Sequence, residues 1–170
     1  MEPIHFHSII ETSDNKLWGN HFVVPAAIAA LFLNKGSQRV ICTINHIHSW
    51  QCALLPFGDN KRVISINKTL LKKMGLQTGM QLEVELVQDN SEYGLPVPEE
   101  FSELLNMDGE GKQLFENLTD GKKRTLLYIA AQPKKSEGRV IRAIAIVEHL
   151  KKMNGKIDFK VLSQDLKNQV

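Results

Sequence analysis

One sequence pattern occurs twice between Leu17 and Asp89. Each copy reads as a strand, one or two helical turns, a turn that contains glycine, and a second strand. A shift of about 42 positions aligns the apolar residues of the two copies, placing Val24 on Ile66, Ile28 on Leu70, Val40 on Leu82, Cys42 on Val84 and Ile44 on Leu86. Because one copy is too short to bury both of its faces, we expect the two copies to supply each other's missing apolar wall.

The repeat predicts the fold of the first part of the chain. Residues 26–33 read as a short helix, because Pro25 is well tolerated at a helix start. Residues 39–44 and 47–55 alternate as a hairpin, and Lys68 to Met74 form a second short helix. We therefore predict an α+β chain whose residues 1–92 form a small β-barrel with an approximate two-fold axis.

Beyond residue 92 the periodicity becomes helical. Pro98 opens a first helix, Thr119 or Asp120 caps a later one, and Ser136 caps the last long helix, which closes at Gly155. We predict a helical segment over residues 96–154 that packs against the barrel. Residues 155–170 carry few apolar side chains, and we expect an added strand or a loose tail there.

Composition places the chain among ordinary globular proteins. With 42% hydrophobic residues, 170 residues can build a core without a disulfide or metal. No apolar run is long enough to span a bilayer, and the N-terminus lacks the pattern of a signal peptide. Cys42 and Cys52 lie in apolar runs, so we expect free thiols and a cytoplasmic protein.

Charge is distributed unevenly along the chain. Residues 1–92 are neutral, with eight acidic and eight basic side chains. Residues 95–120, the acidic block, carry seven acidic side chains against one lysine, whereas residues 121–152, the basic block, carry nine basic side chains against two glutamates. Two interpretations stay open: the blocks face each other inside the molecule, or the basic block faces a polyanion.

Dispersed motifs over residues 6–155 resemble known families. The residues that carry the first resemblance are Trp18, Val24-Pro25, Arg39-Val40, Asn67-Lys68, Gly79 to Val84, Asp89 and Val97-Pro98. They resemble a bacterial family of unknown function that looks like a relative of the AbrB and MazE small barrels. The resemblance implies a double-split barrel, in which two strand–helix–strand units are fused in one chain.

A second resemblance covers the helical segment. Its residues are Phe101, Phe115 to Leu118, Lys122 to Arg124, Tyr128-Ile129, and the series Lys135, Glu137, Arg139 and Arg142. They resemble the YdeI/OmpD-associated segment, which is linked by name to bacteriocin protection. Where that family has threonine before the first arginine of the last helix, this chain has Gly138.

The candidate binding residues belong to two groups. The first is a cationic group that could grip phosphate oxygens, made of Lys122, Lys123, Arg124, Lys134, Lys135, Arg139 and Arg142. The second is an aromatic group that could line a small-molecule cleft at the barrel mouth or could belong to the core, made of Trp18, Trp50 and Phe57. The alternative for the cations is pairing with the acidic block, or plain solvated charge.

We expect no catalytic residues, no metal and no cofactor. The pairs His5/His7 and His46/His48 have a spacing that metals can use, but no further ligand motif accompanies them. No phosphate loop, nucleophile elbow or zinc-protease motif is present. We therefore predict a non-enzymatic protein that binds an unknown ligand or polyanion, through a barrel–helix cleft or the basic helical face.

Two alternatives come from other classes. The first is a DNA-binding regulator of the AbrB type, which a neutral barrel disfavours because phosphate contacts dominate affinity for nucleic acids. The second is an enzyme whose site forms only in three dimensions. The sequence does not determine the ligand, the biological process or the oligomeric state.

Overall fold

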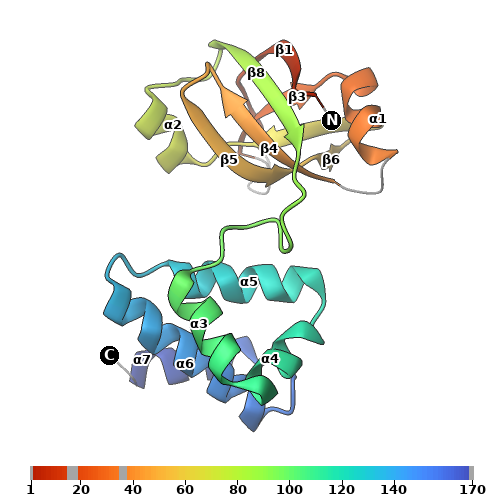
Figure 1. The fold of residues 1–170 in the computed structure, drawn as a ribbon. Coiled ribbons are helices and arrows are strands. Elements are labelled where there is room, and N and C mark those ends of the chain that lie inside the picture. The colour runs from red at the N-terminus through yellow and green to blue at the C-terminus, as the bar shows by residue number, and fades with distance from the viewer. Residues whose placement is uncertain (1, 15–18, 35–37, 169–170) are drawn as a thin grey trace. The chain divides into compact units, whose positions relative to one another are not determined.

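The computed structural model describes residues 2–14, 19–34 and 38–168. It divides into two compact units, residues 1–90 and residues 91–170 (Figure 1). The first unit contains all the strands of the described chain and two short helices, and the second is helical. The protein is therefore of the α+β class, with a C-terminal helical segment, as predicted.

The first unit is built from short elements that alternate as the repeat predicts. In chain order they are β1 (Ile4–Ile9), β2 (Glu11–Thr12), β3 (Asn20–Val24), α1 (Ala26–Leu33), β4 (Arg39–Ile44), β5 (His48–Ala53), β6 (Leu55–Phe57), β7 (Lys61–Ser65), α2 (Lys68–Met74) and β8 (Gln81–Gln88). Helix α2 starts at the Asn67 cap, whose side chain accepts from the Leu70 amide, and ends at Gly75 in the left-handed conformation.

The strands form two four-stranded antiparallel sheets, ordered β1-β8-β4-β5 and β2-β3-β7-β6. Each copy of the repeat contributes one strand to each sheet. In β3–β7 Phe22 lies opposite Ile64, and in β4–β8 Thr43 lies opposite Glu85. Both pairs join residues 42 positions apart, which is the spacing of the repeat. Among the described residues, no strand pairing closes the two sheets into a barrel.

The inner faces of the two copies share one core. The residues that the repeat aligns in the strands, or directly after one at Ile66, are all buried, at 1% exposure or less: Val24, Ile66, Val40, Leu82, Cys42, Val84, Ile44 and Leu86. Ile28 and Leu70, the aligned helix residues, are partly buried against that core. Each copy therefore covers apolar surface that the other would expose.

Both cysteines belong to this core or its edge. Cys42 is buried and Cys52 is half-buried, and both are free thiols. Burial raises the pKa of the Cys42 thiol, and its hydrogen bond with Cys52 adds to the effect. Cys42 is therefore a neutral core side chain.

The second unit is a bundle of five helices within the described chain. They are α3 (Glu99–Met107), α4 (Gly109–Glu116), α5 (Asp120–Ala131), α6 (Ser136–Lys152) and α7 (Phe159–Asn168). Its core is aromatic at the centre, because Phe115 packs edge-on against Tyr93 and Phe101, with ring centroids 5.7 and 5.2 Å away. None of the described helices has the length and apolar character that crossing a bilayer requires.

The end of the chain differs from the prediction. We expected an added strand or a loose tail over residues 155–170, but residues 159–168 form α7. Leu162 of α7 is 1% exposed and belongs to the core of the helical unit. The expectation was wrong because it counted apolar residues and overlooked their helical spacing. Leu162 and Leu166 pack on the core, the Asp158 side chain accepts from the Lys160 and Val161 amides, and Asp165 contacts His149 of α6.

Candidate functional site

Arg139, a predicted phosphate ligand, is held by a carboxylate of the acidic block. Its Nε and Nη2 atoms donate to the two carboxylate oxygens of Glu100, at 2.9 and 2.7 Å. Its Nη1 atom donates to the Lys134 carbonyl oxygen at 2.9 Å. Ser136 donates to the same Glu100 carboxylate at 2.6 Å. The guanidinium therefore joins α3 to the start of α6 by a forked ion pair.

Two further cations of the basic block pair with acidic residues. Lys123 contacts Glu116 at 2.8 Å, and Glu116 also accepts from the Tyr93 hydroxyl at 2.6 Å. Lys151 forms an ion pair with Asp108. Among the described residues, three cations of the basic block therefore have partners in the acidic block.

The other predicted cations have different surroundings. Arg142 donates through Nη1 to the Ile129 carbonyl oxygen at 3.1 Å and to the Gln132 side chain. The remaining four are exposed or half-buried and make no ion pair with any described residue: Lys122, Arg124, Lys134 and Lys135. The structure thus distributes the cationic group over several local settings, and a polyanion site made from it stays a prediction.

The aromatic group is also distributed. Trp18 lies outside the described residues. Trp50 is on β5 and packs against the core of the first unit, whereas Phe57 is on β6 in the other sheet. The Phe57 ring lies 4.7 Å from the His21 ring, centroid to centroid. A cleft formed by these aromatic residues stays a prediction.

Of the two histidine pairs in the first unit, three members are exposed, and the fourth, His48, is half-buried. His5 is 3.7 Å from Glu85, and His46 is 2.9 Å from Glu83. Among the described residues, no group of three or more His, Cys, Asp or Glu side chains is arranged to hold a metal ion.

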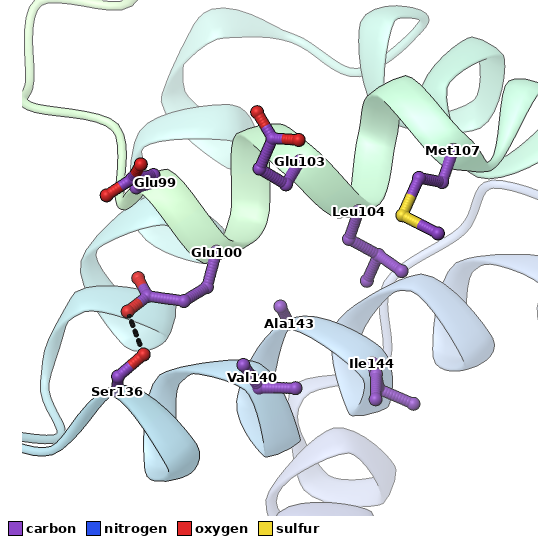
Figure 2. Close-up of a pocket in the computed structure, with 9 residues that line it drawn as sticks. All are labelled: Glu99, Glu100, Glu103, Leu104, Met107, Ser136, Val140, Ala143 and Ile144. Carbon is purple, nitrogen blue, oxygen red and sulfur yellow. Dashed lines mark hydrogen bonds between the residues drawn. The ribbon is translucent and has the colours of Figure 1, made fainter.

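A cavity of the helical unit lies between α3 and α6 and has a volume of about 380 Å³. Its lining residues are Glu99, Glu100, Glu103, Leu104, Met107, Ser136, Val140, Ala143 and Ile144. We refer to it as the α3–α6 groove. Figure 2 shows Glu99 and Ser136 at one end, and Met107 and Ile144 at the other. The groove thus passes from a polar end to an apolar end.

The apolar end is exposed to an unusual degree. Met107 is 84% exposed, and Val140 and Ile144 are both 42% exposed. Val140, Ile144 and Val147 share one face of α6 by their spacing, but only Val147 is buried, at 1% exposure. The core lies beside that face, where Ile146 and Leu150 are fully buried. The sequence did contain a signal for exposed apolar residues on α6, because its apolar residues form a wider stripe than one buried helix face requires.

The acidic side chains of the groove differ in their environment. The hydrogen bonds from Arg139 and Ser136 lower the pKa of Glu100 from its usual 4.5 to about 2. Glu99 and Glu103 are exposed, and Glu103 has no ion-pair partner among the described residues. The groove therefore has an apolar floor beside a negatively charged edge.

The Glu100 ion pair predicts a pH dependence of stability. Because the folded-state pKa lies below the usual value, the folded state binds fewer protons than the unfolded state between pH 4.5 and about 2. The stabilisation is therefore complete above pH 4.5 and lost as the pH falls towards 2. We expect Glu100→Gln to melt a few degrees below the wild type at pH 7, with the difference closing at low pH.

Thermal melts followed by circular dichroism at steps of pH would measure that difference. Glu110→Gln, which removes an exposed charge from α4, is the control for net charge. A melting difference for Glu100→Gln that does not change between pH 7 and pH 2 would contradict the prediction.

Comparisons with known protein families divide the chain at the same place as the structure. Residues 6–86 match a domain of unknown function, DUF1905. Residues 95–152 match the family described as "Bacteriocin-protection, YdeI or OmpD-Associated" (OmdA). The chain thus matches a DUF1905 domain followed by an OmdA segment. This order agrees with both resemblances found in the sequence. A comparison with curated proteins gives no match.

The groove lies entirely within the OmdA segment, whose match ends at α6. The ion pair between Glu100 and Arg139 joins the first and last helices of that segment. Helix α7 lies beyond the matched residues.

Proposed function

We propose that this protein is a non-enzymatic binding protein of the YdeI/OmpD-associated type, and that the α3–α6 groove binds a basic amphipathic segment of a peptide. The observation that carries the proposal is the exposed apolar floor of the groove beside Glu99 and Glu103. Exposed apolar patches with polar rims are typical of interaction sites.

The shape of the groove favours a helical ligand. Val140 and Ile144 are one helical turn apart on α6, and Leu104 and Met107 face them from α3 (Figure 2). A ligand helix with apolar residues at positions i, i+3 and i+4 can place that face between two such helices. Helix-in-groove binding removes apolar area from water on both partners.

The negative charge at the edge of the groove favours a ligand with basic side chains. Glu100 is neutralised by Arg139, but Glu99 and Glu103 are exposed carboxylates at the edge of the groove. Lys or Arg side chains on the flank of a ligand helix would meet them, and these contacts would set the orientation and the association rate more than the affinity. An acidic peptide would be repelled.

The family description agrees with a peptide ligand. The matched family is described as bacteriocin-protection, and we infer that the bacteriocin would present a peptide segment to the groove. Binding of a toxin segment in the groove is one way in which such a segment could protect a cell. The free thiols Cys42 and Cys52 are the reason to propose a cytoplasmic location.

For the DUF1905 domain we propose a double-split, AbrB-like architecture with an approximate two-fold axis. The support is the strand register, because Phe22 and Ile64, and likewise Thr43 and Glu85, are partners 42 positions apart. A two-fold axis would pass through both pairs.

DNA binding of the AbrB type stays an alternative, for which binding of random duplex DNA at ~50 mM salt is the appropriate assay.

A synthetic Leu/Lys amphipathic peptide of roughly 14 residues, about four helical turns, tests the groove. We expect saturable binding to the full chain by fluorescence anisotropy, weakened when salt rises from ~50 to ~300 mM. A peptide with Glu in place of every Lys should not bind. Ile144→Ser should weaken binding about tenfold because it removes apolar contact area.

Matched controls separate the groove from the rest of the surface. Ile141 is 37% exposed on the same helix but does not line the groove, so Ile141→Ser should keep the wild-type affinity. Glu103→Gln should weaken binding ~2- to 5-fold, as expected for an exposed charge pair, whereas Glu110→Gln should not. Equal effects of Ile141→Ser and Ile144→Ser would rule out the groove.

A further inference from the structure

A second cavity of the helical unit lies on another side of α6 and has a volume of about 560 Å³. Residues of α5, α6 and α7 line it, and we refer to it as the α5–α7 cavity. Its apolar walls are Ile129, Phe159, Leu162 and Leu166, and its cations are Arg142 and Lys167. No carboxylate is among its lining residues. Its volume lies within the ~300–1,000 Å³ of ordinary small-molecule sites.

Arg142 differs from Arg139 in its partners. Its Nη1 atom donates to the Ile129 carbonyl oxygen and the Gln132 side chain, which hold the guanidinium beside the end of α5. No carboxylate of the described chain lies within ion-pair distance of it. A half-buried guanidinium held in position, with donors left over, is suited to an oxyanion.

The apolar wall supplies a second, independent feature. Phe159, the first residue of α7, is 46% exposed, whereas Leu162, one turn later, is 1% exposed. The wall therefore runs from solvent down to the core of the bundle. A hydrocarbon chain or flat ring lying on it would cover the Phe159 ring without displacing any buried side chain.

We propose that the α5–α7 cavity binds a small organic carboxylate with an apolar body, the carboxylate at Arg142 and Lys167 and the body against Phe159 and Leu162. This site is distinct from the α3–α6 groove. Val140 and Ile144 line the groove and Arg142 lines the cavity, and none of them lines both. The proposal therefore does not depend on the proposed peptide binding.

A purely structural role for Arg142 is the rival explanation, because its bonds to Ile129 and Gln132 also satisfy the last turn of α5. The two explanations differ in what they predict for ligand charge. A structural arginine stabilises the fold without distinguishing an anion from a cation in the cavity.

Decanoate is a suitable probe, titrated below its micelle concentration into the isotope-labelled full chain and followed by amide NMR shifts. We expect saturable shifts at the end of α5, around Arg142 and along α7. Decyltrimethylammonium, with the same chain and the opposite charge, should bind at least tenfold more weakly. Equal binding of the two, or decanoate shifts confined to other regions, would overturn the proposal.

Variants test the named residues. Arg142→Gln should weaken decanoate binding about tenfold, and Arg142→Lys should weaken it less, because lysine keeps the charge but loses the fork of donors. Arg124→Gln removes a half-buried arginine of α5 that does not line the cavity. The affinity of this variant for decanoate should therefore stay within about twofold of the wild-type value. Unchanged affinity in Arg142→Gln would reject the assignment.

Lys167→Gln and Phe159→Ser provide tests that do not disturb the end of α5. Each should weaken decanoate binding while the melting temperature stays close to the wild-type value. Vesicles of phosphatidylglycerol separate a free carboxylate from a lipid surface. Shifts at the cavity with vesicles but not with decanoate would make the free-carboxylate proposal wrong.

Discussion

His149→Ala is expected to lower the free energy of unfolding of the helical unit by about 3 kcal/mol, through lost hydrogen bonds and a cavity. The His149 side chain is 1% exposed, on α6. Its Nε2 atom lies 3.2 Å from the Asp158 backbone nitrogen, and its Nδ1 atom lies 3.3 Å from an Asp165 carboxylate oxygen. The imidazole therefore joins α6 to α7.

The tautomer follows from these contacts. A backbone amide can only donate, so Nε2 of His149 accepts from Asp158 and the proton resides on Nδ1, which donates to Asp165. Alanine would leave the Asp158 amide without its acceptor and open a cavity where the buried imidazole lies. We therefore expect α7 to lose its anchor before the rest of the bundle unfolds.

Urea unfolding followed by circular dichroism at 222 nm would measure the loss, and amide exchange along α7 would locate it. The control is His5→Ala, because the His5 side chain is 51% exposed and lies in the extended strand β1. His5→Ala should cost less than about 0.5 kcal/mol, as surface changes usually do. Equal losses in the two variants would refute the anchoring role of His149.

Gly111→Ala is expected to cost about 1–2 kcal/mol, because overpacking of a tight contact outweighs the gain in helix propensity. Gly111 is buried in α4, where an added Cβ atom would lie 2.5 Å from Val147 Cγ1 and 3.2 Å from Asp108 Cγ. Valine has little rotamer freedom in a helix and cannot swing aside. Asp108 caps α4 by accepting from the Gly111 amide at 2.9 Å, so its displacement also weakens the cap.

The chain offers a matched control and a rescue. Gly121 lies in α5 with no atom within 4 Å of an added Cβ, so Gly121→Ala should be neutral or stabilise by ~0.5–1 kcal/mol. Adding Val147→Ala to Gly111→Ala should recover part of the loss, because the two changes share one contact. If Gly111→Ala and Gly121→Ala changed the free energy of unfolding in urea by the same amount, close packing between α4 and α6 would not explain why residue 111 is glycine.

The sequence alone is sufficient to predict those helices and strands whose start and stop signals lie within a few residues of them. Helices α1 (Ala26–Leu33) and α2 (Lys68–Met74) begin and end at the predicted residues, because Pro25, Asn67 and Gly75 act on their own neighbours. The repeat likewise predicted which strand residues are buried. The YdeI/OmpD-associated resemblance was confirmed because its motifs are carried by the residues themselves.

Other features depend on residues that are distant in sequence. The partner of Arg139 is Glu100, 39 positions away, so charge blocks alone could not distinguish internal pairing from an exposed basic face. The position of helix α7 depends on contacts from His149 to Asp158 and Asp165, although the Asp158 cap and the spacing of Phe159, Leu162 and Leu166 are local helix signals. The α3–α6 groove exists because one side of α6 packs on the core while Val140 and Ile144 do not.

The sequence by itself determined the α+β class, the repeat and the two families, because periodicity, caps and glycine turns act over a few residues. Only the tertiary structure decided which cations are paired, where apolar surface stays open and how the chain ends. Those outcomes depend on which helix faces meet, and burial and ion pairing are properties of contacts between segments that the chain brings together only on folding.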